Sequence, residues 1–384
     1  MNYQKWLSVN FFAFFFTWGV FLPYWTGYLI IVKDLSVPHA SIIMGAGMVA
    51  RALSTFIIFP AAAKKASIRK IMLWTAGLSL FTMVLYIPAD SFVFLLLITI
   101  LFSVIYPILL PAMESSASVL MQSERIHYGK SRSFGSLGYT VGLLIIGATT
   151  AIWSEESILW VMLIGLASMW FLHTRPSPAI LTKAPEQVLQ IDTKSQWKKL
   201  FSSKPFVVVL ILAILLQGAH ASYYNFGFIY LQELGVNSFY IGIVLNVAIL
   251  LEILFFSRAD TLFSNTRIST MFMIAAIGST IRWILIAAFP IVWVFVLSQF
   301  LHAISFGVAH YAFMQFISKR LSHDAIPAAQ GMYAALAMGL STAVLTFAGG
   351  YLYDFSPGLA FLGMALCSIP AIFIIIFTRN KHQY

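Results

Sequence analysis

Three charged residues lie inside long apolar stretches of the sequence, where a charge is costly. Arg51 lies in GAGMVARAL, Glu252 in AILLEILFF and Arg282 in STIRWILIA. A charge at the centre of a membrane helix costs about 2.5–3.5 kcal/mol on insertion scales, so such residues by default indicate a solute or proton pathway. We therefore expect Glu252 and Arg282 to serve transport chemistry; the alternative is an ion pair that only joins helices. For Arg51 the alternative is a contact that closes a gate.

Further polar side chains accompany these three. Glu114 and Arg132 lie toward the ends of apolar stretches, and His220, His302 and His310 lie within them. An arginine can bind a solute, and a carboxylate or an imidazole can carry a proton, although a buried histidine can also simply hydrogen-bond a neighbouring helix. Among the charges, three arginines stand against two glutamates. The unpaired cation favours a solute with a carboxylate, because the guanidinium fork matches that group.

The elements that must position these residues are membrane-spanning helices. Of the 384 residues, 60% are hydrophobic and 9% are charged, and the mean hydropathy is +0.89. A soluble domain is about a quarter charged, so this composition excludes a soluble enzyme. The apolar stretches are continuous rather than alternating, which excludes a transmembrane barrel. The sequence predicts an all-α integral membrane protein, and its one cysteine, Cys367, excludes a disulfide framework.

Breaks in the apolar stretches predict twelve transmembrane helices in two sets of six. The spans are expected at 6–31, 40–60, 71–88, 92–121, 133–153 and 158–172, then at 205–231, 238–257, 268–289, 291–317, 328–353 and 359–377. The predicted domains are an N-terminal six-helix bundle over 1–172, a cytoplasmic linker over 173–204 and a C-terminal six-helix bundle over 205–384.

The basic residues predict the orientation. Of the 23 Lys and Arg residues, twenty fall in segments on one side of the predicted spans, and only Lys33 falls on the other. By the positive-inside rule, both termini are cytoplasmic, in a bacterial inner membrane crossed many times. The basic residues flank spans rather than forming one patch, so the formal net charge of +10 does not indicate a nucleic-acid partner.

A weak internal repeat supports the two-bundle plan. WGVFLPYW at 18–25 and QGAHASYY at 217–224 each place two aromatic residues five and six positions after a glycine. Parallel repeats of this kind place the solute site near the bilayer midplane. We therefore expect His220 and the paired Tyr223 and Tyr224, Tyr224 above all, to contact the solute; the alternative for the two tyrosines is a membrane-interface belt.

The spacing of the polar residues resembles that of a known transporter branch. Glu114 and Arg132 are eighteen apart, and Arg282 and His302 are twenty apart. These spacings resemble the lactose permease branch of the major facilitator superfamily, a family of proton symporters. The resemblance implies that Glu114 and Arg132 bind substrate, and that Glu252, Arg282 and His302 serve proton coupling.

Two positions depart from that branch. The resemblance would place a proton-carrying glutamate where this chain has Ser305, and a ring-stacking tryptophan where it has Tyr139. Under the resemblance, the proton is therefore assigned to Glu252, and Tyr139 is expected to bind the ring of the substrate.

The motifs FLPYW, GAGMVARAL, LLQGAHASYY, YGKSR and QGMYAALAMG are similar to the 3-phenylpropionic acid transporter group. The resemblance implies proton symport of a small aromatic carboxylate such as 3-phenylpropionate by alternating access, with Arg51 or Arg132 on the carboxylate. The alternative is proton symport of a neutral sugar or nucleoside. No His-Glu-x-x-His motif or phosphate-binding loop occurs, so we expect neither an enzyme nor a metal or cofactor. A monomer in lipid, with solute and protons as partners, suffices.

Overall fold

Every regular element of the computed structural model is a helix among the residues that it describes, 2–63, 65–123, 126–182, 193–322 and 325–382. Eleven helices there are long and apolar enough to cross a membrane. The remaining predicted span corresponds to α4 (Ile68–Val84), whose 17 residues make it one residue shorter than the shortest of the eleven. The predicted all-α fold with twelve spans is confirmed.

The chain divides into two compact units, residues Met1–Leu189 with Asn237–Ile243, and Gln190–Val236 with Val244–Tyr384. The predicted limits of the two bundles stay a prediction, and residues 183–192 of the predicted linker lie outside the described residues.

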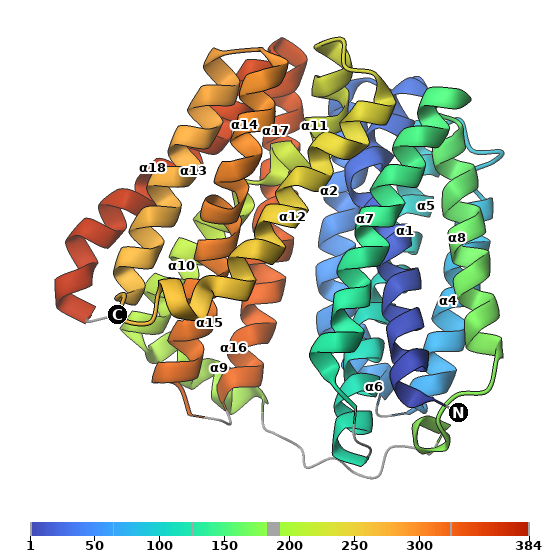
Figure 1. Ribbon diagram of the computed structural model, residues 1–384, viewed down its shortest axis with the longest axis horizontal. Coiled ribbons are helices and arrows are strands. Elements are labelled where there is room, and N and C mark those ends of the chain that lie inside the picture. Colours follow the sequence, from blue (N-terminus) through green and yellow to red (C-terminus); the bar gives the residue numbers. More distant parts are fainter. Residues whose placement is uncertain (1, 64, 124–125, 183–192, 323–324, 383–384) are drawn as a thin grey trace. The chain divides into compact units, whose positions relative to one another are not determined.

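The first unit contains the elements up to α8. They are α1 (Tyr3–Ile31), α2 (Val37–Leu53), η1 (Ser54–Ile58), α3 (Phe59–Ala63), α4, α5 (Phe92–Ile105), η2 (Tyr106–Ile108), α6 (Leu109–Ser123), α7 (Tyr128–Ile152) and α8 (Ser157–Thr174), followed by η3 (Ala179–Thr182) (Figure 1).

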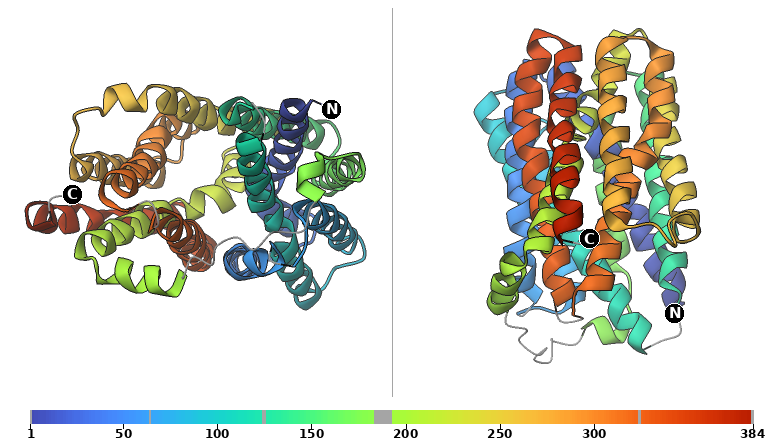
Figure 2. Two further views of the ribbon diagram at one scale, coloured as in Figure 1. Left: turned by 90° about the horizontal axis from the view of Figure 1, so that it is seen from below. Right: turned by 90° about the vertical axis from the view of Figure 1, so that its left-hand side faces the viewer.

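The second unit contains most of the rest. Its elements are α9 (Thr193–Ser202), α10 (Lys204–Gly218), α11 (Ala221–Glu233), α12 (Ser238–Leu262) from Val244 on, α13 (Ile268–Ala288), α14 (Val292–His302), η4 (Ala303–Val308), α15 (Ala309–Arg320), α16 (Ile326–Met332), η6 (Tyr333–Leu340), α17 (Ser341–Phe355) and α18 (Pro357–His382). Helix α18 packs along α13 and α17 (Figure 2).

Ordinary capping residues begin and end these helices. The Ser36 hydroxyl accepts a hydrogen bond from the backbone N–H of His39 at the start of α2, and Ser91 does the same for Phe94 at the start of α5. Such side chains satisfy backbone donors that have no partner within the first turn. After α11, Gly235 has a φ of 81°, a left-handed conformation that glycine adopts without steric cost.

Helices α1 and α7 approach each other through glycines. They lie side by side in Figure 1. A Cβ added at Gly138 would lie 2.2 Å from the Phe12 carbonyl oxygen, and one at Gly142 would lie 2.5 Å from that of Phe16. No side chain fits between backbones this close, which is the usual role of small residues between membrane helices.

Several spans are interrupted. The span Lys204–Glu233 breaks at Ala219 and His220, between α10 and α11. Three others contain the π-helical segments η1, η4 and η6, whose wider turns are frequent at functional sites. His302 immediately precedes η4, and Arg51 lies three residues before η1. The interruptions therefore fall beside residues that the sequence singled out.

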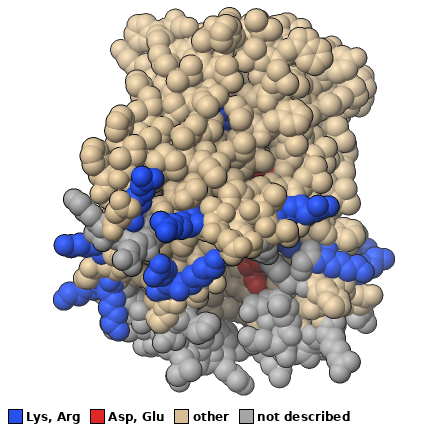
Figure 3. Space-filling view, turned by 60° about the vertical axis from the view of Figure 1, so that its left-hand side comes forward, with Lys and Arg blue, Asp and Glu red and all other residues tan. Residues whose placement is uncertain are grey.

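The surface suits lipid. On the face drawn in Figure 3, Lys and Arg side chains form a band toward one end, and other residue types cover most of the remainder. Large apolar side chains such as Trp74, Trp160 and Trp293 are more than half exposed. Because such an exterior would be unfavourable in water, the chain is a multi-pass membrane protein.

Candidate functional site

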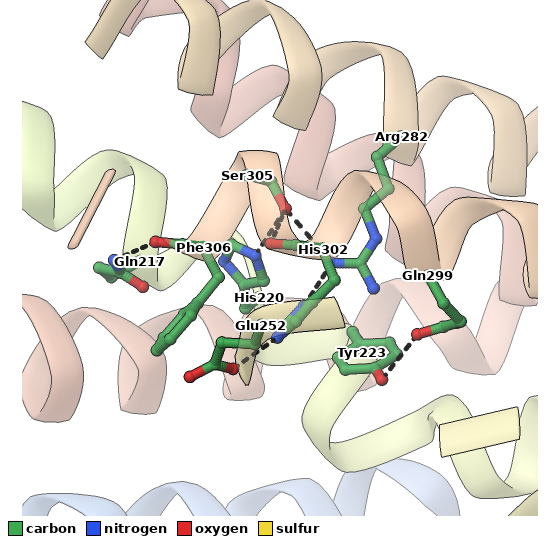
Figure 4. A network of polar contacts seen from close by, with 9 residues as sticks. All are labelled: Gln217, His220, Tyr223, Glu252, Arg282, Gln299, His302, Ser305 and Phe306. Carbon is green, nitrogen blue, oxygen red and sulfur yellow. Dashed lines mark hydrogen bonds and ion pairs between the residues drawn. The ribbon is translucent and has the colours of Figure 1, made fainter. Parts of the chain in front are cut away.

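A chain of three side chains in the second unit joins the charges of α12 and α13. Nη1 of Arg282 lies 2.9 Å from Nδ1 of His302, and Nε2 of His302 lies 3.6 Å from Oε2 of Glu252. Arg282 and His302 are buried, whereas the Glu252 side chain is 25% exposed. Figure 4 shows the three residues arranged in this order.

The contacts define the protonation of His302. A guanidinium only donates hydrogen bonds, so Nδ1 of His302 must accept from Arg282. His302 is then neutral and carries its hydrogen on Nε2, which faces Glu252. Because 3.6 Å exceeds an ordinary hydrogen-bond length, the contact with Glu252 is electrostatic.

Ser305 links Arg282 to a second imidazole. Its hydroxyl oxygen lies 3.3 Å from Nη1 of Arg282 and 3.1 Å from Nε2 of His220. Nδ1 of His220 lies 2.9 Å from the carbonyl oxygen of Leu216, so Nδ1 donates and Nε2 can accept from Ser305. We refer to Arg282, His302, Glu252, Ser305 and His220 as the Arg282 cluster.

Aromatic rings enclose the guanidinium of Arg282. Its central carbon lies 4.5 Å from the Tyr223 ring centroid and 4.4 Å from that of Trp283, both within cation–π range. The Tyr223 hydroxyl donates its hydrogen to Gln299 at 2.9 Å, and its oxygen lies close enough to Arg282 to interact with the guanidinium. Nε and Nη2 of Arg282 have no hydrogen-bond partner in the described part of the chain.

A second charged site lies in the first unit. Nε of Arg132 on α7 lies 3.6 Å from Oε1 of Glu114 on α6, and both side chains are about one-third exposed. The guanidinium of Arg132 stacks over the Phe15 ring at 4.1 Å. The structure thus brings together the two residues that the resemblance assigns to substrate.

Arg51, also in the first unit, stacks over the Trp18 ring at 4.4 Å. The two side chains line a narrow pocket together with Tyr106, Thr99 and Ser103. Across the described residues, no carboxylate lies within ion-pairing distance of Arg51. An aromatic wall beside an unneutralised cation suits an aromatic anion.

Other candidates take different places. The backbone carbonyl of Tyr139 packs against Gly19. The Tyr224 ring stacks 5.9 Å from His220, and His310 lies 2.8 Å from the Tyr333 hydroxyl, outside the Arg282 cluster. Tyr223, rather than its neighbour Tyr224, covers Arg282.

The residues that sequence reasoning missed are mainly rings. Trp18 stacks with Arg51, and Trp283 with Arg282, yet aromatic residues are too common here to stand out. The one usable signal was the position of Trp283 next to Arg282 in the sequence.

Comparison with known proteins places these residues in a wider group. A model of the MFS_1 like family matches residues 4–363. The "Probable 3-phenylpropionic acid transporter" of Escherichia coli (strain K12) is 30% identical over 373 residues, 96% of each chain. The maltose permease of Geobacillus stearothermophilus is 25% identical over 305 residues, covering 78% of this chain and 75% of the permease.

Solved structures share the fold. The nucleoside transporter NupG superposes with a TM-score of 0.83 at 18% identity, over 98% of this chain and 99% of NupG. The peptide transporter POT superposes with a TM-score of 0.77 at 11% identity, over 99% of this chain and 94% of POT.

Proposed function

We propose that this chain, which belongs to the MFS_1 like family of the major facilitator superfamily, takes up a small aromatic carboxylate together with a proton. The family resemblance expected from the sequence is confirmed. Membership makes the chain a secondary transporter and not an enzyme, as predicted. The proton, the carboxylate and the residues that bind them are the proposal.

The observation that carries the proposal is the chain Arg282–His302–Glu252. It places a partly exposed carboxylate at one end of a buried, charged network. A carboxylate in this position can exchange protons with water and respond to a cation through the intervening imidazole. Glu252 is therefore the proposed proton carrier, and Arg282 and His302 adjust its affinity for the proton.

The charges of the candidate residues support an anionic substrate. Arg132 is paired with Glu114, so the cations available to a substrate carboxylate are Arg51 and Arg282. The name of the 30% identical relative, a probable 3-phenylpropionic acid transporter, points to the same chemical class. Tyr139, His220 and Tyr224 stay proposed substrate contacts.

The proposed setting follows from the charge bias of the sequence. A bacterial inner membrane with both termini in the cytoplasm accounts for the one-sided distribution of Lys and Arg. A monomer that exposes its site alternately to the two sides suffices for transport.

Proteoliposome uptake tests the proposal. Radiolabelled 3-phenylpropionate should accumulate when the external pH is lowered, because each proton that moves down the gradient brings one monoanion with it. Liposomes without protein and wild-type liposomes at equal pH on both sides are the controls. Accumulation of the same size with and without the pH step would contradict proton coupling.

A neutral sugar or nucleoside is the second candidate. The 25% identical maltose permease and the polar, partly exposed Glu114–Arg132 pair favour it. A thermal-shift screen of the purified protein against sugars, nucleosides and aromatic acids separates the two, since a ligand stabilises only the state that it binds. Stabilisation by sugars or nucleosides and not by acids would replace the proposed substrate.

A further inference from the structure

The unused edge of Arg282 is the strongest unexplained feature of the second unit. Nε–H and Nη2–H of a guanidinium point in parallel from one edge, and this edge matches the two oxygens of a carboxylate. In Arg282 neither donor makes a hydrogen bond of normal geometry to a described residue, although the Tyr223 oxygen lies close by, and Arg282 is 0% exposed. The edge therefore has the donor pattern of a carboxylate site.

The neighbouring groups leave this edge free. Nη1 of Arg282 is occupied by His302 and Ser305. The described carboxylate nearest along the network, Glu252, contacts His302 instead of Arg282. A buried, charged donor without a strong acceptor is unfavourable, so an anion that binds along this edge would gain stabilisation from both donors.

The other two arginines differ in this respect. Arg132 already has Glu114 beside it and is about one-third exposed. Arg51 is partly exposed and lines a narrow pocket. Of these three arginines, Arg282 is the one whose full burial calls for an additional hydrogen-bond acceptor.

We propose that the Nε–Nη2 edge of Arg282 binds the carboxylate of the transported monoanion, with the Tyr223 and Trp283 rings beside it. This inference rests on the proposed function, because it assumes that the substrate carries a carboxylate. It adds the binding of the substrate carboxylate to a residue that the sequence analysis assigned to proton coupling.

The charges around Arg282 then explain how substrate and proton are coupled. The titratable groups facing Arg282 are His302, His220, Tyr223 and Tyr224, with Glu252 at the end of the cluster. His310 and its partner Tyr333 also face Glu252. With the imidazoles and tyrosines neutral, the charges of Arg282 and Glu252 cancel. A bound monoanion leaves the cluster with one excess negative charge in a poorly solvated site. Protonation of Glu252 restores neutrality, so one proton accompanies each monoanion.

Binding measurements on the purified full-length protein test the subsite. The probes are 3-phenylpropionate and its neutral amide, and the variants are Arg282→Lys and Arg175→Lys. Lysine keeps the charge but lacks the fork, so Arg282→Lys should lower affinity for the acid about 10–100-fold. Arg175→Lys is the matched control, because Arg175 also stacks on a ring, Phe171, at the end of α8, and it should leave the affinity unchanged.

The outcomes separate the subsite from the proposed function. Acid affinity that is equal in wild type and Arg282→Lys overturns the subsite but keeps the substrate class. Wild-type protein that binds no monocarboxylate overturns both. An equal loss for acid and amide, or a lowered melting temperature without ligand, indicates a structural role and overturns the subsite.

Proton uptake by the wild-type protein gives a measurement that does not depend on whether Arg282→Lys folds. Wild-type protein should take up one proton per acid bound, measured by calorimetry in buffers of different ionisation enthalpy, and none per amide bound. Glu252→Gln should bind the acid without proton uptake. Acid binding by wild type with no proton uptake would overturn the coupled subsite.

Discussion

Replacement of Glu252 by glutamine should separate solute movement from proton movement. The carboxylate lies 3.6 Å from His302, whose other nitrogen is occupied by Arg282, so Glu252 is the acidic end of the Arg282 cluster. Glutamine keeps the shape but cannot change its charge. The variant cluster therefore carries one permanent positive charge and needs no proton to accept a monoanion.

The size of the effect follows from the stoichiometry. One proton moving across a step of one pH unit supplies about 1.4 kcal/mol, which supports about tenfold accumulation of a monoanion at equilibrium. With the membrane potential clamped at zero, wild type should approach about tenfold accumulation. Glu252→Gln should equilibrate at a ratio of about one, because nothing couples its substrate to the gradient.

The assay is uptake of labelled 3-phenylpropionate into proteoliposomes with potassium and valinomycin, with and without the pH step. Exchange of labelled for unlabelled substrate at equal pH is measured in parallel and should persist in Glu252→Gln. Tenfold accumulation by the variant would refute the assignment of the proton to Glu252. Loss of exchange as well as accumulation would show that Glu252 is needed for binding or folding instead.

Three other substitutions test neighbouring parts of the argument. Ser305→Glu should abolish thermal stabilisation by 3-phenylpropionate, since a carboxylate next to Nη1 would neutralise Arg282 and repel the substrate carboxylate, whereas Ser305→Ala should retain it. Gly138→Ala should lower the melting temperature and destabilise the protein by about 1–3 kcal/mol, because the added methyl group overpacks against Phe12. The control Gly227→Ala, where the nearest neighbours are 3.7 Å away, should not lower it. Equal melting temperatures for the two variants would contradict the close packing of α1 on α7. Glu114→Gln should change the free energy of unfolding by about 1 kcal/mol or less, because exposed ion pairs such as Glu114–Arg132 contribute little to stability. If the pair binds substrate, the same variant should raise the KM of transport at least about tenfold. An unchanged KM would mean that the pair is structural.

The sequence predicted the charged residues of the site better than its walls. Glu114 and Arg132, or Arg282 and His302, could be singled out because charge within apolar stretches is rare, and each pair is in contact. The excess of one arginine over the two glutamates can be counted from the sequence, but composition alone could not tell which arginine would lack a carboxylate.

The sequence pattern alone could not tell whether Tyr223 or Tyr224 faces the site. Helical periodicity assigns a face to each residue only while the helix continues. The span that contains both tyrosines breaks at Ala219 and His220, so the face of α11 cannot be extrapolated from α10. A tertiary contact, the guanidinium of Arg282 over Tyr223, shows which ring faces the site.

The backbone contact between α1 and α7 has a mechanical consequence. At Gly138 and Gly142 the backbone of α7 lies directly against backbone carbonyls of α1. Neither helix can therefore slide along the other without a collision of main-chain atoms. Trp18 on α1 and Arg132 on α7 are thereby held at a nearly constant separation. Any rearrangement of the first unit during a transport cycle should therefore move these two residues together, because α1 and α7 move as one rigid body.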